Sequence, residues 1–163
     1  MKAFLFTLLA GCASSQVPAQ PQAPQPPMAQ MRQTPAELTA APTDTNQIGS
    51  SKLAGVHTKV LYGDPTKAGY YAILLYVPAN TTIQAHMHRD NRVATVVAGT
   101  WRFGYGDKFD EGALEVLPPG SVYTEPSSAH FAQTRDENVI VELTGFGPTD
   151  THYINPSDDP EHK

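Results

Sequence analysis

Cysteine is almost absent from this chain. Cys12 is the only one among 163 residues, so no internal disulfide can form. Charge is also sparse: 17% of the residues are charged, and the formal net charge of −5 is spread without any basic stripe. A protein that binds nucleic acid needs such a stripe or patch, so the composition argues against nucleic acid as a partner.

Several catalytic signatures are missing as well. The sequence contains no glycine-rich phosphate loop, no nucleophile elbow of a Ser-His-Asp hydrolase and no heptad repeat. No amphipathic helix longer than a turn or two is visible. A chain of 163 residues has room for one hydrophobic core, so we expect one domain whose function resides in a pocket.

The N-terminus carries the features of an export signal. Lys2 precedes the apolar residues 3–10, a run too short to cross a bilayer and typical of a signal peptide. Residues 9–12, Leu-Ala-Gly-Cys, resemble the bacterial lipobox, in which cleavage precedes a cysteine that is then lipidated. We expect a signal peptide at residues 1–11 and a lipid anchor at Cys12, which places the protein in the periplasm of the bacterial cell envelope. An ordinary secretory signal is the alternative.

Proline and glutamine dominate the segment that follows. Over residues 12–47 they alternate with many alanines, and such a composition buries too little apolar surface to fold. The prolines favour an extended polyproline II conformation. We therefore expect a disordered tether, then a folded domain at residues 48–158 and an acidic tail at residues 159–163.

The domain is predicted to be all β. Short segments rich in Val, Ile, Tyr, Thr and Phe are separated by turns that contain Gly, Pro, Asn or Asp. Regularly spaced strands without helices are typical of a sandwich or a barrel. The eight expected strands are residues 56–62, 70–77, 82–88, 94–105, 114–117, 121–124, 130–134 and 139–144.

Three histidines lie on these strands at a spacing that suits a metal site. His86 and His88 are two residues apart on one expected strand, so both imidazoles point to the same face. His130 begins another expected strand. If the two strands are neighbours, the third imidazole completes a facial triad.

The arrangement resembles the cupin superfamily over about residues 50–158. In the first cupin motif, a His-x-His pair is followed by a glutamate and, after six more residues, by a glycine. Here His86 and His88 are followed by Gly99, but Arg92 stands at the position of the glutamate.

The second cupin motif is matched in part. Gly120, Pro126 and His130 agree with it, whereas Ser128 replaces a glycine, one residue is missing before the histidine, and Thr134 replaces an asparagine. Other stretches resemble a subgroup of small single-domain cupins. The match is specific for a fold and weak for a reaction, because cupins share a barrel and not a chemistry.

The resemblance implies a jelly-roll barrel, the double-stranded β-helix, that holds a divalent transition metal on His86, His88 and His130. Imidazole ligands suit Fe, Zn, Ni or Cu, and the sequence does not choose among these metals. The resemblance also implies a small-molecule ligand or substrate, and pairing of two barrels in a homodimer.

Arg92 leaves three interpretations open. A guanidinium is always charged, cannot ligate a metal, and is repelled by a divalent cation in a pocket of low dielectric constant. Arg92 therefore turns away to pair with Asp90 or another acid, or binds the carboxylate or phosphate of a ligand beside the metal, or marks a barrel that has lost its metal.

Two function hypotheses follow. The first is a metal-dependent oxygenase or hydrolase acting on a small molecule, which is anionic if Arg92 orients it. The second is a non-catalytic module that binds or senses a metal or small ligand, and a fourth protein ligand closing the site would favour it. The candidate substrate contacts are Arg92, Gln84, Tyr105 and Gln133. Glu125 and Glu142 are further polar residues near the ligand strands that are available to line the pocket.

Overall fold

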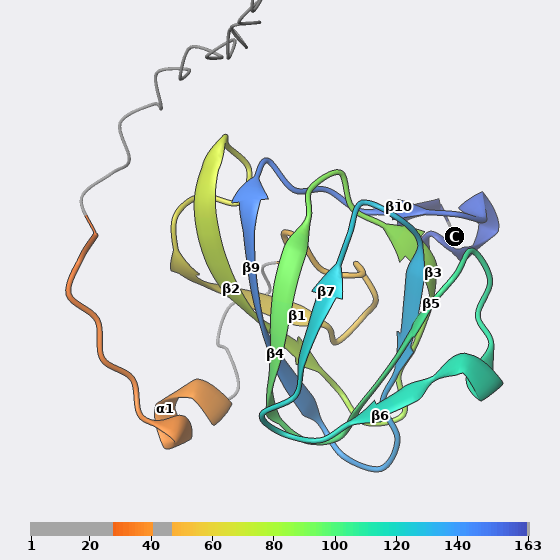
Figure 1. Ribbon diagram of the computed structural model, residues 1–163, viewed down its shortest axis with the longest axis horizontal. Helices are drawn as coiled ribbons and strands as arrows, with labels where there is room; N and C mark the ends of the chain where they lie inside the picture. The colour runs from red at the N-terminus through yellow and green to blue at the C-terminus, as the bar shows by residue number, and fades with distance from the viewer. Residues whose placement is uncertain (1–27, 41–46, 163) are drawn as a thin grey trace, which may run out of the picture.

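Two five-stranded antiparallel sheets face each other in the computed structural model, which describes residues 28–40 and 47–162 (Figure 1). The predicted signal peptide, the lipobox with Cys12 and most of the predicted tether lie outside the described residues. Within the described part of the chain, no helix has the length and apolar character needed to cross a membrane.

The first sheet has the strand order β1-β2-β9-β4-β7, and the second has the order β10-β3-β8-β5-β6, which confirms the predicted all-β fold class. The strands are β1 (His57–Tyr62), β2 (Gly69–Val77), β3 (Thr82–Met87), β4 (Arg92–Ala98), β5 (Trp101–Tyr105), β6 (Glu115–Leu117), β7 (Val122–Glu125), β8 (His130–Gln133), β9 (Val139–Gly147) and β10 (His152–Tyr153). The short helices are α1 (Pro35–Thr39) and the 3-10 turns η1 (Glu111–Ala113), η2 (Pro156–Asp158) and η3 (Pro160–His162).

Side chains that alternate along the strands form the core between the sheets. On β2, Tyr71 and Ile73 are buried in this core. On the opposite face of β2, Leu74 and Tyr76 pack with Leu38 of α1, and the Tyr76 hydroxyl donates a hydrogen bond of 2.7 Å to the Leu38 carbonyl. Because both faces of β2 are covered, its sequence is continuously apolar and does not alternate.

Helix α1 lies inside the segment that the composition predicted to be a disordered tether. The Thr34 side chain accepts a hydrogen bond from the backbone N–H of Glu37, and the Glu37 carboxylate accepts one from the backbone N–H of Thr34, which forms a capping box. Pro35 occupies the first turn, where its missing N–H costs nothing. Local capping and the packing of Leu38 against the sheet therefore form a short helix that the composition of the segment did not indicate.

One predicted strand proves to be two. Residues 94–105 divide at Gly99 into β4, which belongs to the first sheet, and β5, which belongs to the second. Gly99 has φ of +72°, a left-handed conformation that reverses the chain and that glycine adopts without steric cost. Strand β10 was not predicted, because its two residues are too few to show a pattern.

We expect Gly99→Ala to destabilise the fold more than Gly120→Ala. Both glycines have positive φ, at +72° and +87°, so each substitution introduces backbone strain of about 1–2 kcal/mol. A Cβ at Gly99 would also lie 2.3 Å from the Asn138 carbonyl oxygen, whereas a Cβ at Gly120 meets nothing within 4 Å. Urea unfolding of the two variants measures the difference, and equal losses would contradict the packing argument.

Candidate metal centre

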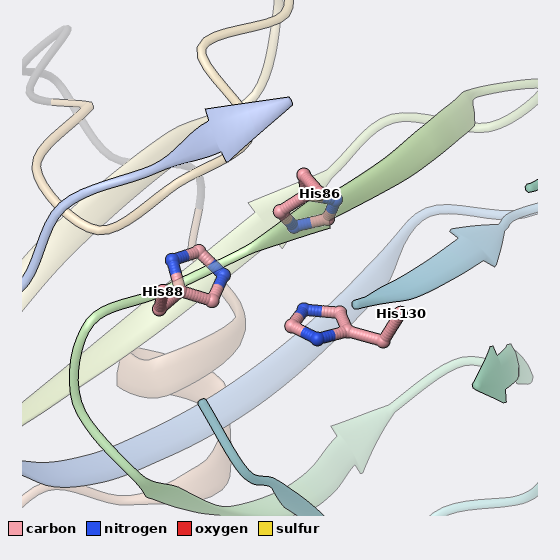
Figure 2. A group of neighbouring side chains, drawn as sticks. All are labelled: His86, His88 and His130. Atoms are coloured by element: carbon pink, nitrogen blue, oxygen red, sulfur yellow. The ribbon is translucent and has the colours of Figure 1, made fainter. Parts of the chain in front are cut away.

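The three histidines meet at one end of the second sheet. His86 lies on β3, and His88 is the first residue after the end of this strand. His130 begins β8, which is the antiparallel neighbour of β3. His86 and His130 are opposite each other in the register. Their exposed fractions are 5%, 1% and 1%, and one ligand nitrogen from each ring lies within 4.8 Å of the others. Figure 2 shows the three rings around a common space, as the spacing of the histidines predicted.

Each imidazole is held by a backbone carbonyl on its outer side. Nδ1 of His86 lies 2.8 Å from the carbonyl oxygen of Gln84, and Nδ1 of His88 lies 2.5 Å from that of Asp150. Nδ1 of His130 lies 3.2 Å from the carbonyl oxygen of Ser128. A carbonyl can only accept, so each Nδ1 must carry the hydrogen. Every Nε2 of a neutral ring is then an acceptor that is free to ligate a metal.

Burial keeps these rings neutral. It lowers the pKa of His86 to about 3 and that of His130 to about 4, and it holds the pKa of His88 well below its usual value. The positive charge of Arg92 adds to the effect at all three rings. At neutral pH the centre therefore presents three uncharged imidazoles, the form that binds transition metals.

Both terminal nitrogens of the Arg92 guanidinium have partners beside the three rings. Its Nη2 lies 2.5 Å from Oε2 of Glu125, and its Nη1 donates a hydrogen bond of 2.9 Å to the carbonyl of Gly49. Arg92 on β4 and Glu125 on β7 are directly opposite in the register, and both side chains are buried. The partner is Glu125 and not Asp90, whose carboxylate accepts a hydrogen bond of 2.6 Å from the Tyr71 hydroxyl.

Glu125 belongs to the centre itself. Its Oε2 lies 3.9 Å from Nε2 of His88 and 3.9 Å from Nε2 of His130. Glu125 was expected among the polar residues available to line the pocket, and it does line the cavity, but its contacts with the histidines and Arg92 were not predicted. Alternation along β7 is the signal that identifies it: Tyr123 and Glu125 are buried, and Val122 and Thr124 are exposed.

A small cavity of about 20 Å³ adjoins the centre, which is room for about one water molecule. Residues 49–51 line it, and their three consecutive carbonyls accept hydrogen bonds. Gly49 accepts from Arg92, Ser50 accepts from the Thr151 hydroxyl at 2.7 Å, and Ser51 accepts from the Tyr153 hydroxyl at 2.5 Å. The cavity is lined by residues 49–51, Leu75, Ile83, His86, Arg92, Trp101, Phe103, Glu125, His130, Ala132 and Leu143.

Of the four predicted substrate contacts, only Arg92 lines this cavity. Gln84 does not line the cavity, because a β-bulge between Ile83 and His86 changes the alternation of the strand. Ile83 and His86 both face inward, whereas Gln84 lines a hollow on the outer surface. Gln133 follows the inward Ala132 on β8 and therefore faces outward.

Tyr105 and Glu142 also lie outside the cavity. Tyr105 is 53% exposed at the end of β5, where its hydroxyl donates a hydrogen bond of 2.6 Å to the Thr124 carbonyl. Glu142 lies between Val141 and Leu143, which are both core residues of β9, so its side chain is on the outer face of the first sheet.

No protein-family model matches the chain, and no curated protein matches it. Several solved structures are similar to it in fold. The polyketide cyclase RemF from Streptomyces resistomycificus is similar with a TM-score of 0.57 and 15% identity over 81% of this chain and 90% of that one. A cupin 2 conserved barrel domain protein from Rhodopseudomonas palustris has a TM-score of 0.50 and 13% identity over 63% and 69%.

A structure described as that of the DMSP lyases RdDddP and RnDddQII gives a TM-score of 0.52 and 18% identity. That match covers 76% of this chain but only 60% of the lyase chain. Identities at this level show the fold alone. The chain therefore has the double-stranded β-helix fold of cupins, as its motifs predicted.

We expect the Arg92–Glu125 pair to behave as a unit in stability measurements. In protein treated with a chelator, Arg92→Met and Glu125→Gln should each cost about 3–5 kcal/mol, because each leaves a buried charge without its partner. Arg92→Met/Glu125→Gln should cost much less than the sum of the two. Urea unfolding of the wild type and the three variants completes the cycle, and additive losses would contradict the pairing.

Proposed function

We propose that this protein binds a divalent transition metal through His86, His88 and His130 and acts on a small molecule. The observation that carries the proposal is the fixed orientation of the imidazoles. Three backbone carbonyls hold the Nδ1–H groups, so three buried Nε2 acceptors face one another. His88 Nε2 accepts no hydrogen bond from any residue the structure describes, which suits an atom reserved for a cation.

The donor set fits Fe, Zn, Ni or Cu, which all accept imidazole nitrogen. A metal bound here would supply Lewis-acid chemistry to a coordinated water or ligand. The chain's own residues orient the rings through the carbonyls of Gln84, Ser128 and Asp150, and they exclude bulk water by burial.

An anionic ligand is the class that the charges favour. Arg92 and Glu125 cancel each other, and three neutral imidazoles add no charge, so a divalent ion would keep its full positive charge. Such a site attracts a carboxylate or a phosphate more strongly than a neutral molecule. Two structural neighbours are named as enzymes of small molecules, a polyketide cyclase and DMSP lyases, which is in keeping with a small ligand.

A non-catalytic binding or sensing role is the second candidate, and the closure of the site favours it. The three histidines are at most 5% exposed, and the adjoining cavity holds about one water molecule. A substrate larger than water therefore fits the cavity only if its lining rearranges. An enzyme needs this rearrangement in every turnover, whereas a protein that stores or senses a metal does not.

We also propose that the mature chain is exported and anchored in the bacterial cell envelope through lipidated Cys12. The basis is the lipobox-like Leu-Ala-Gly-Cys sequence at residues 9–12, together with the absence of any other cysteine. The barrel would then face the periplasm at the end of a proline-rich segment. We further propose that two barrels pair in a homodimer, which would cover exposed edges of their sheets.

Metal analysis by mass spectrometry tests the central proposal. Protein purified without chelator should contain about one equivalent of Fe, Zn, Ni or Cu, and His86→Ala/His88→Ala should lose it because two of three ligands are gone. The matched control is His57→Ala/His152→Ala, which also removes two histidines but none from the centre. An unloaded wild type, even after reconstitution with each metal, would overturn the proposal.

Cell fractionation tests the anchor. The wild-type protein should be found with membranes and should incorporate a labelled fatty acid, and Cys12→Ser should abolish the label and release the protein. A wild type that is soluble in the periplasm and unlabelled would support the ordinary secretory signal instead.

A further inference from the structure

Glu125 supplies the least expected feature of the centre. Its carboxylate has two donors, the Arg92 guanidinium at Oε2 and the Tyr123 hydroxyl at Oε1, and Oε2 also faces two imidazole nitrogens at 3.9 Å, those of His88 and His130. Both nitrogens are acceptors, because the hydrogens of these rings lie on Nδ1. Three acceptors thus lie close together, and neither imidazole nitrogen donates a hydrogen to the carboxylate.

Such a convergence is unfavourable unless a cation occupies the space. Glu125 is 4% exposed and His88 is 1% exposed, so water does not screen the repulsion between the lone pairs. His88 Nε2 has no hydrogen-bond partner among the described residues, and Glu125 Oε2 has the Arg92 guanidinium as its partner. These two acceptors lie 3.9 Å apart, a spacing that suits two ligands of one ion.

We propose that Glu125 is the fourth protein ligand of the metal, so that the donor set is three imidazoles and one carboxylate. This inference rests on the proposed metal site. The carboxylate is provided by β7 and not by β4, because the β4 position directly opposite Glu125 is occupied by Arg92.

Arg92 is compatible with this role and supports it. Its guanidinium is fixed between Glu125 and the Gly49 carbonyl, so it cannot swing towards the ion. A carboxylate oxygen can accept from a guanidinium and ligate a metal at once, and metal-bound carboxylates are commonly held by such a hydrogen-bonding group. Arg92 thereby holds Glu125 in place beside the imidazoles.

The test is binding of Co²⁺ as the only probe, followed by competition with a coloured chelator and by the visible absorption of the bound ion. The decisive variant is Arg92→Met/Glu125→Gln, in which removal of both charges avoids an unpaired buried charge. The single variant Glu125→Gln is measured beside it. The matched control is Glu142→Gln, the same substitution on the outer face of β9.

We expect both Glu125 variants to bind Co²⁺ at least about 10-fold more weakly than the wild type and to show an altered visible spectrum, since a charged ligand has been removed. Glu142→Gln should match the wild type in both respects. If Glu125→Gln fails to fold, the double variant alone decides. A double variant with wild-type affinity and spectrum overturns the inference.

Failure of this inference is distinguishable from failure of the proposed function. If the wild type binds Co²⁺ and His86→Ala/His88→Ala does not, the metal site stands, and unchanged binding by the Glu125 variants removes only the fourth ligand. If the wild type binds no Co²⁺, both proposals fall together.

Discussion

Three hydrogen bonds from imidazole Nδ1–H groups to backbone carbonyls are the constraint on which the candidate centre depends. They fix each ring's orientation and its tautomer, and they leave every Nε2 as an acceptor. The carbonyls are available because none lies in a regularly paired stretch: Gln84 lies in the β-bulge of β3, Ser128 in the turn before β8, and Asp150 in the loop before β10. The irregular parts of the barrel thus position the site.

The same arrangement explains the buried charges. Three acceptors facing one another repel, and burial prevents the rings from relieving the repulsion by taking up protons. Arg92 neutralises Glu125 on one side without donating to any imidazole. Two charges that cancel cost the fold less than one would. The barrel can therefore keep a carboxylate beside the rings without a net buried charge.

The sequence predicted the parts of the site that follow from simple alternation. His86 and His88 share a face because they are two residues apart on one strand, and the second motif identified His130. Gln84 has the same parity and was placed on the same face, but the bulge between Ile83 and His86 turns it outward. A bulge changes one hydrogen-bonded pairing and leaves no distinctive residue in the sequence, so it could not be predicted.

The identity of the partner of Arg92 was also beyond the sequence. Asp90 is close in the chain, whereas Glu125 is opposite in the β4–β7 register, and register is a property of the folded sheet. The segment at residues 49–51 carries no motif, because the hydrogen bonds that hold it in the cavity lining are accepted by backbone carbonyls. Function that resides in backbone groups leaves little trace in residue identity.

The size of the cavity bears on the choice between an enzyme and a sensor. Its lining leaves room for about one water molecule, which suits a metal with a coordinated water better than an organic substrate. Residues 49–51 are held in this lining by the Arg92 guanidinium and by the hydroxyls of Thr151 and Tyr153. A ligand larger than water therefore enters only if the lining rearranges, and it stabilises the rearranged state only as far as it binds that state better than the state described here.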